Sequence, residues 1–104
     1  MAVTSKVLAR TAAATTSATL YTQPNTSTIT VVTNINVTNT TTAAATFTIS
    51  IDSVALQSAS TLAANSTAYL DLKQVIPASN PAKLITGLAS TTGVNFHISG
   101  VEIV

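Results

Sequence analysis

The chain has 104 residues and a formal net charge of +1, and its length suits one domain with a single core. Hydrophobic residues make up 46% of the chain but charged residues only 7%, whereas an ordinary globular protein carries about 25% charged residues. The four Lys and Arg residues are scattered and only four residues are aromatic, which disfavours nucleic-acid binding, and so little charge indicates that much of the surface contacts other protein.

Residues 1–18 predict an N-terminal arm or edge strand ahead of a domain that spans residues 19–104. Val3 and Val7 suit a strand at the edge of a sheet. The run of small residues at 11–18 lacks the large apolar stripe that would dock a helix against a core. We therefore expect a loop or arm in that run.

A strand with one buried face is predicted from Ile29 to Val37. Its odd-numbered residues are mostly apolar and its even-numbered residues mostly polar, a period of two that places the odd positions in the core. After a polar turn at residues 39–42, residues 47–51 alternate in the same way, with Phe47 facing inward. We expect these two segments to pair with each other as a hairpin.

Turn signals divide the middle of the chain. Asp52–Ser53 predicts a tight turn into the next strand, because short polar side chains satisfy backbone groups and Asp tolerates left-handed conformations. Residues 61–66 predict a connection to a strand at residues 68–76, whose even positions, Leu72 among them, face inward. The two prolines in residues 77–81 predict a loop, since each removes a backbone donor and restricts the residue before it.

The C-terminal part predicts two more strands. The first, at residues 83–89, is short and is interrupted by a glycine. In the second, apolar residues occupy even positions up to Ile98 and odd positions from Val101 onward. A β-bulge at Gly100 would explain this change, because one extra residue with a permissive backbone returns Val101 and Ile103 to the core.

These patterns together predict an all-β chain. Its 21 Thr and 18 Val or Ile residues have branched side chains that fit a pleated sheet better than a helix. About seven or eight short strands, with turns every 8–12 residues or so, favour an antiparallel β-sandwich that is jelly-roll-like. No apolar run approaches the ~18 residues needed to span a membrane. The N-terminus does not resemble a secretory signal.

The residues that could carry chemistry are few and dispersed. His97 and Glu102 could join a serine in a catalytic triad, but no nucleophile or oxyanion motif accompanies them. Zinc needs a cluster of ligands, and neither Asp52 nor Asp71 lies in an acidic loop of the kind that binds calcium. We expect no catalytic residue, no metal and no cofactor, and therefore a protein that is not an enzyme.

A series of six short segments extends over residues 19–103. They are Thr19–Thr22, Val32–Ile35, Val37–Thr40, Ala45–Ile49, Leu62–Thr67 and Gly93–Ile103. The series resembles segments of the small β-sandwich structural proteins of tailed-bacteriophage virions. This resemblance implies a virion location without catalytic residues, either as a head decoration protein or as a tail, neck or baseplate component.

As a decoration, or cement, protein the chain would clamp neighbouring subunits of the major capsid protein, and the resemblance favours a homotrimer. A surface of short Thr, Ser and Asn side chains suits a permanent contact, because it loses little solvation energy and little rotamer entropy on burial. We expect the contact on the outer face of the predicted hairpin formed by residues 29–37 and 47–51. The expected contact residues are Thr30, Asn34, Asn36, Thr46 and Thr48.

A carbohydrate-binding or host-adhesion module is the alternative from another functional class. Such modules usually display aromatic side chains that stack on the faces of sugars. Only Tyr21 and Tyr69 are candidates for this role in the present chain.

Overall fold

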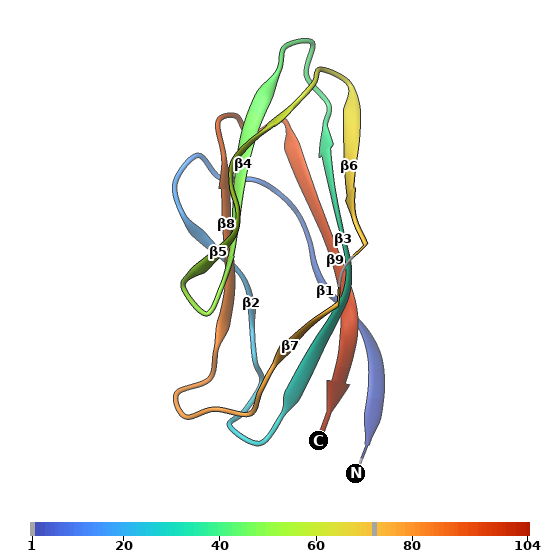
Figure 1. Ribbon diagram of the computed structural model, residues 1–104, viewed down its shortest axis with the longest axis vertical. Helices are drawn as coiled ribbons and strands as arrows, with labels where there is room; N and C mark the ends of the chain where they lie inside the picture. The colour runs from blue at the N-terminus through green and yellow to red at the C-terminus, as the bar shows by residue number, and fades with distance from the viewer. Residues whose placement is uncertain (1, 72) are drawn as a thin grey trace.

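The computed structural model describes residues 2–71 and 73–104, and over these residues it contains nine strands and no helix. The strands form two antiparallel sheets that pack face to face in an elongated molecule of 46 × 22 × 18 Å (Figure 1). The prediction of an antiparallel β-sandwich is therefore confirmed.

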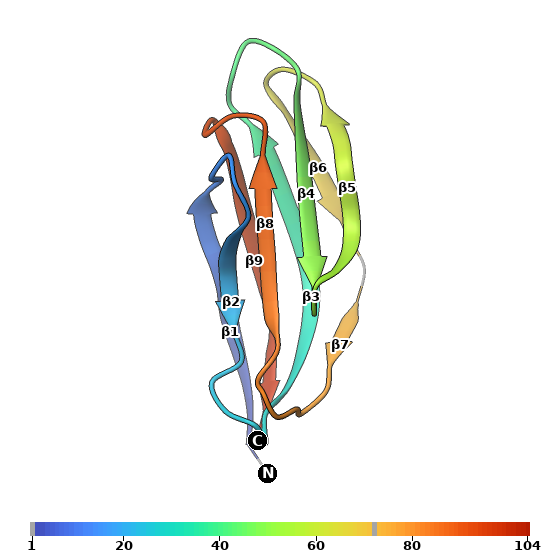
Figure 2. The same cartoon turned by 90° about the vertical axis from the view of Figure 1, so that its left-hand side faces the viewer.

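The strand order within each sheet is that of a jelly roll, in which the chain repeatedly crosses between two sheets. The five-stranded sheet has the order β1 (Val3–Ala12), β9 (Val94–Ile103), β3 (Ile29–Asn39) and β6 (Ser66–Leu70), and β7 (Gln74–Ile76) also pairs with β3. The four-stranded sheet, which faces the viewer in Figure 2, has the order β2 (Ala18–Thr22), β8 (Leu84–Ala89), β4 (Ala45–Ile51) and β5 (Val54–Leu62).

The N-terminal strand, β1, lies at the edge of the five-stranded sheet and pairs with β9. The run of small residues at 11–18 contributes the end of β1, the connection to β2 and the first residue of β2. At the other end of the chain, β9 lies between β1 and β3, so the two termini come close together, as Figure 1 shows.

The predicted hairpin between the segments now named β3 and β4 is wrong, because these strands lie in different sheets. The buried side chain of Asn39, at the end of β3, stabilises the connection between the two layers. Its Nδ2 atom donates hydrogen bonds to the carbonyl oxygens of Ala43 and Leu62, at 2.9 and 3.2 Å. Its Oδ1 atom accepts hydrogen bonds from the backbone nitrogen and the hydroxyl of Thr41. These bonds fix the turn that takes the chain from one layer to the other.

The predicted inward face of β3 is correct only in the second half of the strand. Ile35 and Val37 are buried there, but Thr30 and Val32 occupy the interior in the first half. The register with β9 shifts after Val32, so Thr33 is an extra, bulged residue. A bulge changes which side chains face the core, and this is why the odd positions before it face outward.

The predicted bulge at Gly100 is also wrong. The even-numbered residues of β9 stay buried along the whole strand, and Val101 and Ile103 lie on its outer side. The extra residues belong to the two neighbouring strands, Leu8 in β1 and Thr33 in β3, both opposite this part of β9.

Glycine is needed at position 100 because three strands approach one another closely there. A Cβ atom on Gly100 would collide with the carbonyl oxygen of Val31 and would lie 2.8 Å from the Cδ1 atom of Leu8. The missing side chain therefore lets β1 and β3 close on β9 at the level of their bulges.

Several predicted turns and strands are present. Asp52 and Ser53 have φ angles of 54° and 62° and join β4 to β5, the combination expected of a type I′ hairpin turn. Residues 77–81 form the predicted loop. The predicted connection at residues 61–66 is shorter because β5 continues through Leu62, and the predicted strand at residues 68–76 is divided between β6 and β7. The inward position expected for Leu72 lies outside the described residues.

Apolar side chains from both sheets fill the space between them. Phe47 of β4 and Phe96 of β9 meet edge to face, with their ring centroids 6.5 Å apart. Branched aliphatic residues pack around this pair, and the fully buried ones include Val32, Ile35, Val37, Ile49, Ile85, Val94 and Ile98. Each sheet therefore has one face in the core and one face directed outward.

Candidate functional site

The five residues expected to form one contact surface do not share a face of the molecule. Thr30 is fully buried, and its hydroxyl bonds to a buried tyrosine. The others are divided between the outer faces of the two sheets, Asn34 and Asn36 on the five-stranded sheet and Thr46 and Thr48 on the four-stranded sheet. They are separated because β3 and β4 belong to opposite layers.

The outer face of the four-stranded sheet carries no charge. None of its strands contains Lys, Arg, Asp or Glu. Its outward residues alternate with the core residues and are mostly short and neutral, including Thr19, Thr46, Thr48, Ser50, Thr61, Thr86 and Leu88. We call these seven residues the uncharged face. At the end of this sheet, Asp52 and Lys83 form an ion pair with an Nζ–Oδ1 distance of 3.0 Å.

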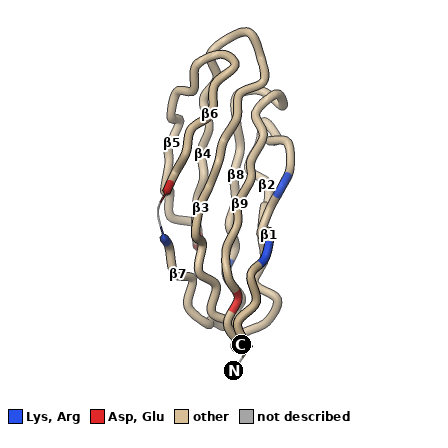
Figure 3. The backbone as a smooth tube through the Cα atoms, turned by 90° about the vertical axis from the view of Figure 1, so that its right-hand side faces the viewer, with Lys and Arg blue, Asp and Glu red and all other residues tan. Residues whose placement is uncertain are grey.

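The outer face of the five-stranded sheet is apolar near the chain termini. The apolar patch there consists of Val3, Ile29, Val31, Val75, Val101 and Ile103. These residues come from β1, β3, β7 and β9, and the register of the strands places them in two neighbouring rows. Val3 and Val75 are 65% and 63% exposed. In Figure 3, which shows this sheet from outside, Lys and Arg residues lie along β1 and beside β7, at its two margins.

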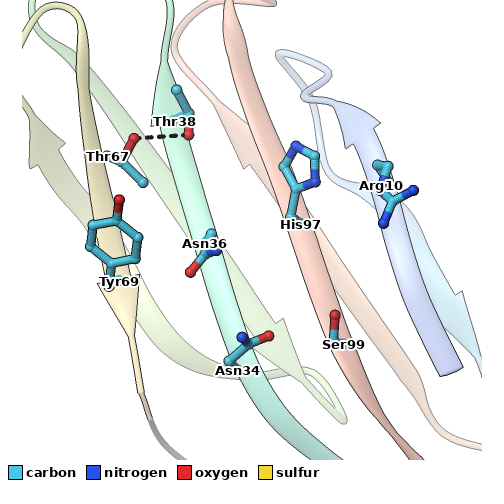
Figure 4. Close-up of a pocket in the computed structure, with 8 residues that line it drawn as sticks. All are labelled: Arg10, Asn34, Asn36, Thr38, Thr67, Tyr69, His97 and Ser99. Carbon is cyan, nitrogen blue, oxygen red and sulfur yellow. Dashed lines mark hydrogen bonds between the residues drawn. The ribbon is translucent and has the colours of Figure 1, made fainter. Parts of the chain in front are cut away.

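Farther from the termini, the same outer face forms a shallow groove of about 370 Å³ with polar side chains (Figure 4). Four of the lining residues form one row across four strands, because Arg10 pairs with His97, His97 with Asn36, and Asn36 with Tyr69. Asn34, which pairs with Ser99, begins the next row toward the termini. We call this surface the polar groove.

A buried polar network lies on the inner side of β9. The Tyr21 hydroxyl donates to Oε2 of Glu102 at 2.5 Å and lies 2.8 Å from the hydroxyl oxygen of Thr30. Lys6 reaches the other carboxylate oxygen, with an Nζ–Oε1 distance of 3.3 Å. Burial, followed by the hydrogen bond to Glu102, raises the pKa of Tyr21 to about 12. The network explains how a carboxylate can be buried in this sandwich.

The residues considered for catalysis and metal binding do not form a common site. His97 is exposed on the outer side of β9, whereas Glu102 is buried on the inner side, so they cannot act together on one serine. Asp52 pairs with Lys83 in the four-stranded sheet, while Asp71 follows β6 in the other sheet. Within residues 2–71 and 73–104, no group of three or more His, Cys, Asp and Glu side chains could hold a metal ion.

The two tyrosines differ in their availability to a ligand. Tyr21 is 6% exposed and is engaged by Glu102, whereas Tyr69 is 74% exposed beside the polar groove. Sequence reasoning missed both the polar groove and the apolar patch. The residue types were visible at outward positions, but only the register of strands far apart in the sequence brings Arg10 and Tyr69 to one row.

In the described part of the chain, no helix is long and apolar enough to cross a membrane. Comparison with known protein families, with curated proteins and with solved structures found no match to this chain.

Proposed function

We propose that this chain is a non-enzymatic structural protein of a bacteriophage virion, specifically a capsid decoration protein that joins neighbouring subunits of the major capsid protein. The apolar patch is the observation that carries the proposal. A contiguous group of solvent-facing aliphatic side chains marks an interaction surface, and here Val3, Ile29 and Val75 are exposed while the other three are half-buried, on a chain with very little charge. Jelly rolls are common in viral capsid proteins, which supports the proposal by analogy of fold.

The two unlike surfaces have separate roles in this proposal. The apolar patch joins copies of this chain into a homotrimer, since permanent interfaces between copies are the more hydrophobic class. The uncharged face, which includes Thr46 and Thr48, contacts the major capsid protein, because neutral short side chains are inexpensive to desolvate. Many copies at fixed spacing then make individually weak contacts act collectively.

Lysine substitutions on each surface test this division. Val75→Lys places a charge in the apolar patch, and Thr46→Lys places one on the uncharged face; Val75 is exposed and Thr46 is half-buried. Thr42→Lys, in the exposed loop between β3 and β4, is the charge-matched control. Light scattering should show trimers for the wild type, Thr46→Lys and Thr42→Lys, and monomers for Val75→Lys.

Binding to virions that lack the protein provides the second measurement. Thr46→Lys should remain trimeric but bind these particles at least about tenfold more weakly, because a buried unpaired charge costs several kcal/mol. Unchanged binding of both surface variants would refute the proposed roles. Electron microscopy of particles with and without the protein tests the location, and copies seen only on the tail would establish a tail, neck or baseplate component instead.

A carbohydrate-binding or host-adhesion module is the second candidate function. The observation that favours it is the polar groove, where an exposed tyrosine stands beside amide and imidazole side chains. Aromatic rings that combine an apolar face with a polar tip suit partly wet binding surfaces. A glycan array probed with the wild type and with Tyr69→Ala tests this candidate, and the absence of any tyrosine-dependent signal would remove it.

A further inference from the structure

The polar groove has two chemically different ends. Arg10 stands at the β1 end of its central row and Tyr69 at the β6 end, with His97 and Asn36 between them. Neighbouring strands are 4.7–4.9 Å apart, so the row measures about 14 Å from end to end. Such a row is long enough to contact several groups of one extended ligand.

The polar atoms of the groove are largely available to a ligand. Among the lining residues, the hydroxyls of Thr38 and Thr67 form a hydrogen bond of 3.1 Å with each other, which is the dashed line in Figure 4. Figure 4 draws no hydrogen bond from Arg10, Asn36 or His97 to the other lining residues, and the ion pairs found over residues 2–71 and 73–104 join Lys6 to Glu102 and Lys83 to Asp52. The row therefore presents donors and acceptors whose partners would come from outside the chain.

The two ends of the polar groove differ in charge. Arg10 supplies a cation at the β1 end. At the β6 end, Asp71 lines a neighbouring hollow together with Tyr69 and Asn34. A ligand with one negative group is attracted toward Arg10 and repelled from Asp71. A polyanion is a poor match, because it would bring negative charge to both ends.

We propose that the polar groove binds a short acidic oligosaccharide, with its carboxylate at Arg10 and a sugar ring on Tyr69; this rests on the second candidate function and names the ligand class of that site. The guanidinium group offers two parallel donors that match a carboxylate. The amides of Asn34 and Asn36 donate to and accept from sugar hydroxyls in the middle of the groove. The phenol ring of Tyr69 covers the apolar face of a sugar.

3′-Sialyllactose, which carries one carboxylate, and its methyl ester provide a matched pair of probes that differ in charge but share their sugar rings. Calorimetry with the intact protein should show 3′-sialyllactose binding about tenfold or more tightly than its methyl ester, the effect of one charge-assisted carboxylate contact. Arrays that include sialylated and glucuronylated saccharides extend the measurement to other acidic sugars.

Substitutions at the two ends of the row separate charge recognition from stacking. Arg10→Gln should weaken acid binding about tenfold and leave ester binding unchanged, with Arg10→Lys between them. Tyr69→Ala should abolish binding of both probes, whereas Tyr69→Phe retains it. Both side chains are exposed, so thermal unfolding of the variants should match the wild type.

The outcomes distinguish this inference from the broader function. Equal affinity for the acid and its ester, or for acidic and neutral sugars on the array, would refute the assignment of an acidic ligand while leaving carbohydrate binding in place. Binding to no saccharide would refute both. Binding that survives Tyr69→Ala and Arg10→Gln unchanged would show that saccharides bind elsewhere on the protein.

Discussion

Tyr21→Phe tests the buried network that holds Glu102 inside the sandwich. The substitution removes one hydroxyl that donates to Glu102 and bonds to Thr30, in a place where the tyrosine and the glutamate are 6% and 8% exposed. A hydrogen bond to a charged group contributes about 1.5–3 kcal/mol, and a neutral one about 1 kcal/mol. Water cannot easily replace the lost donor, so we expect the free energy of unfolding to fall by about 3 kcal/mol.

The same network makes stability depend on alkaline pH. The pKa of Tyr21 is about 12 in the folded protein and 10.0 at its ordinary value. The folded state therefore holds the phenolic proton more tightly, and its stabilising contribution is complete below pH 10 and is lost as the pH rises from 10 through about 12. Two pH units correspond to about 2.7 kcal/mol.

Urea unfolding at fixed protein concentration, at pH 7 and at intervals up to pH 12, measures both effects. In Tyr21→Phe, the loss of stability between pH 10 and pH 12 should be smaller than in the wild type by about 2–3 kcal/mol. Tyr69→Phe is the matched control, since its ring is exposed, and it should keep the wild-type pH profile. A Tyr21→Phe protein within about 0.5 kcal/mol of the wild type at pH 7, with an unchanged alkaline profile, would refute the reasoning.

Three further predictions concern the stability of close strand contacts and turns in the sandwich. Gly100→Ala should lower the free energy of unfolding by about 1–3 kcal/mol in urea titrations, because its Cβ meets the Val31 carbonyl oxygen, and the absence of an effect would mean that β3 can move away. Asn39→Ala should lower the free energy of unfolding by about 2–4 kcal/mol, since the buried Leu62 carbonyl and the partly buried Ala43 carbonyl lose their donor; thermal unfolding within a degree or so of the wild type would contradict this. Ser53→Gly should raise it by about 0.5–1 kcal/mol, because glycine adopts the positive φ of 62° without strain, and a lower melting temperature would contradict the turn assignment.

The local pattern of the sequence was sufficient for several of the strands and for one turn. Alternation of apolar and polar residues is a property of neighbouring positions, and it identified β4 and the second half of β3 with their inward residues. The turn at Asp52–Ser53 was also predictable, because its conformation depends on the short side chains at those two positions. The all-β sandwich follows from the number and spacing of such segments.

Pairing between distant segments could not be predicted in the same way. Alternating strands joined by a short polar connection can form a hairpin or can cross between layers, and here a hydrogen bond from Asn39 to the Leu62 carbonyl in the other sheet stabilises the crossing. In β9, the large apolar residues switch from even to odd positions after Ile98, but the even positions continue to face the core along the whole strand. The tertiary structure makes this possible by bulging the neighbouring strands around Gly100 and by satisfying the buried Glu102.

For the candidate surfaces, too, the sequence determined which residue types face outward, and the tertiary structure determined which of them lie together. The sequence by itself determined that charge is scarce and that outward positions are filled with Thr, Ser and Asn. Only the tertiary structure decided that Thr30 is internal, that Asn34 and Thr46 lie on opposite faces, and that Arg10 and Tyr69 share one row. The physical reason is that composition and alternation are set within each strand, whereas a binding surface is set by the register between strands that meet only when the whole chain has folded.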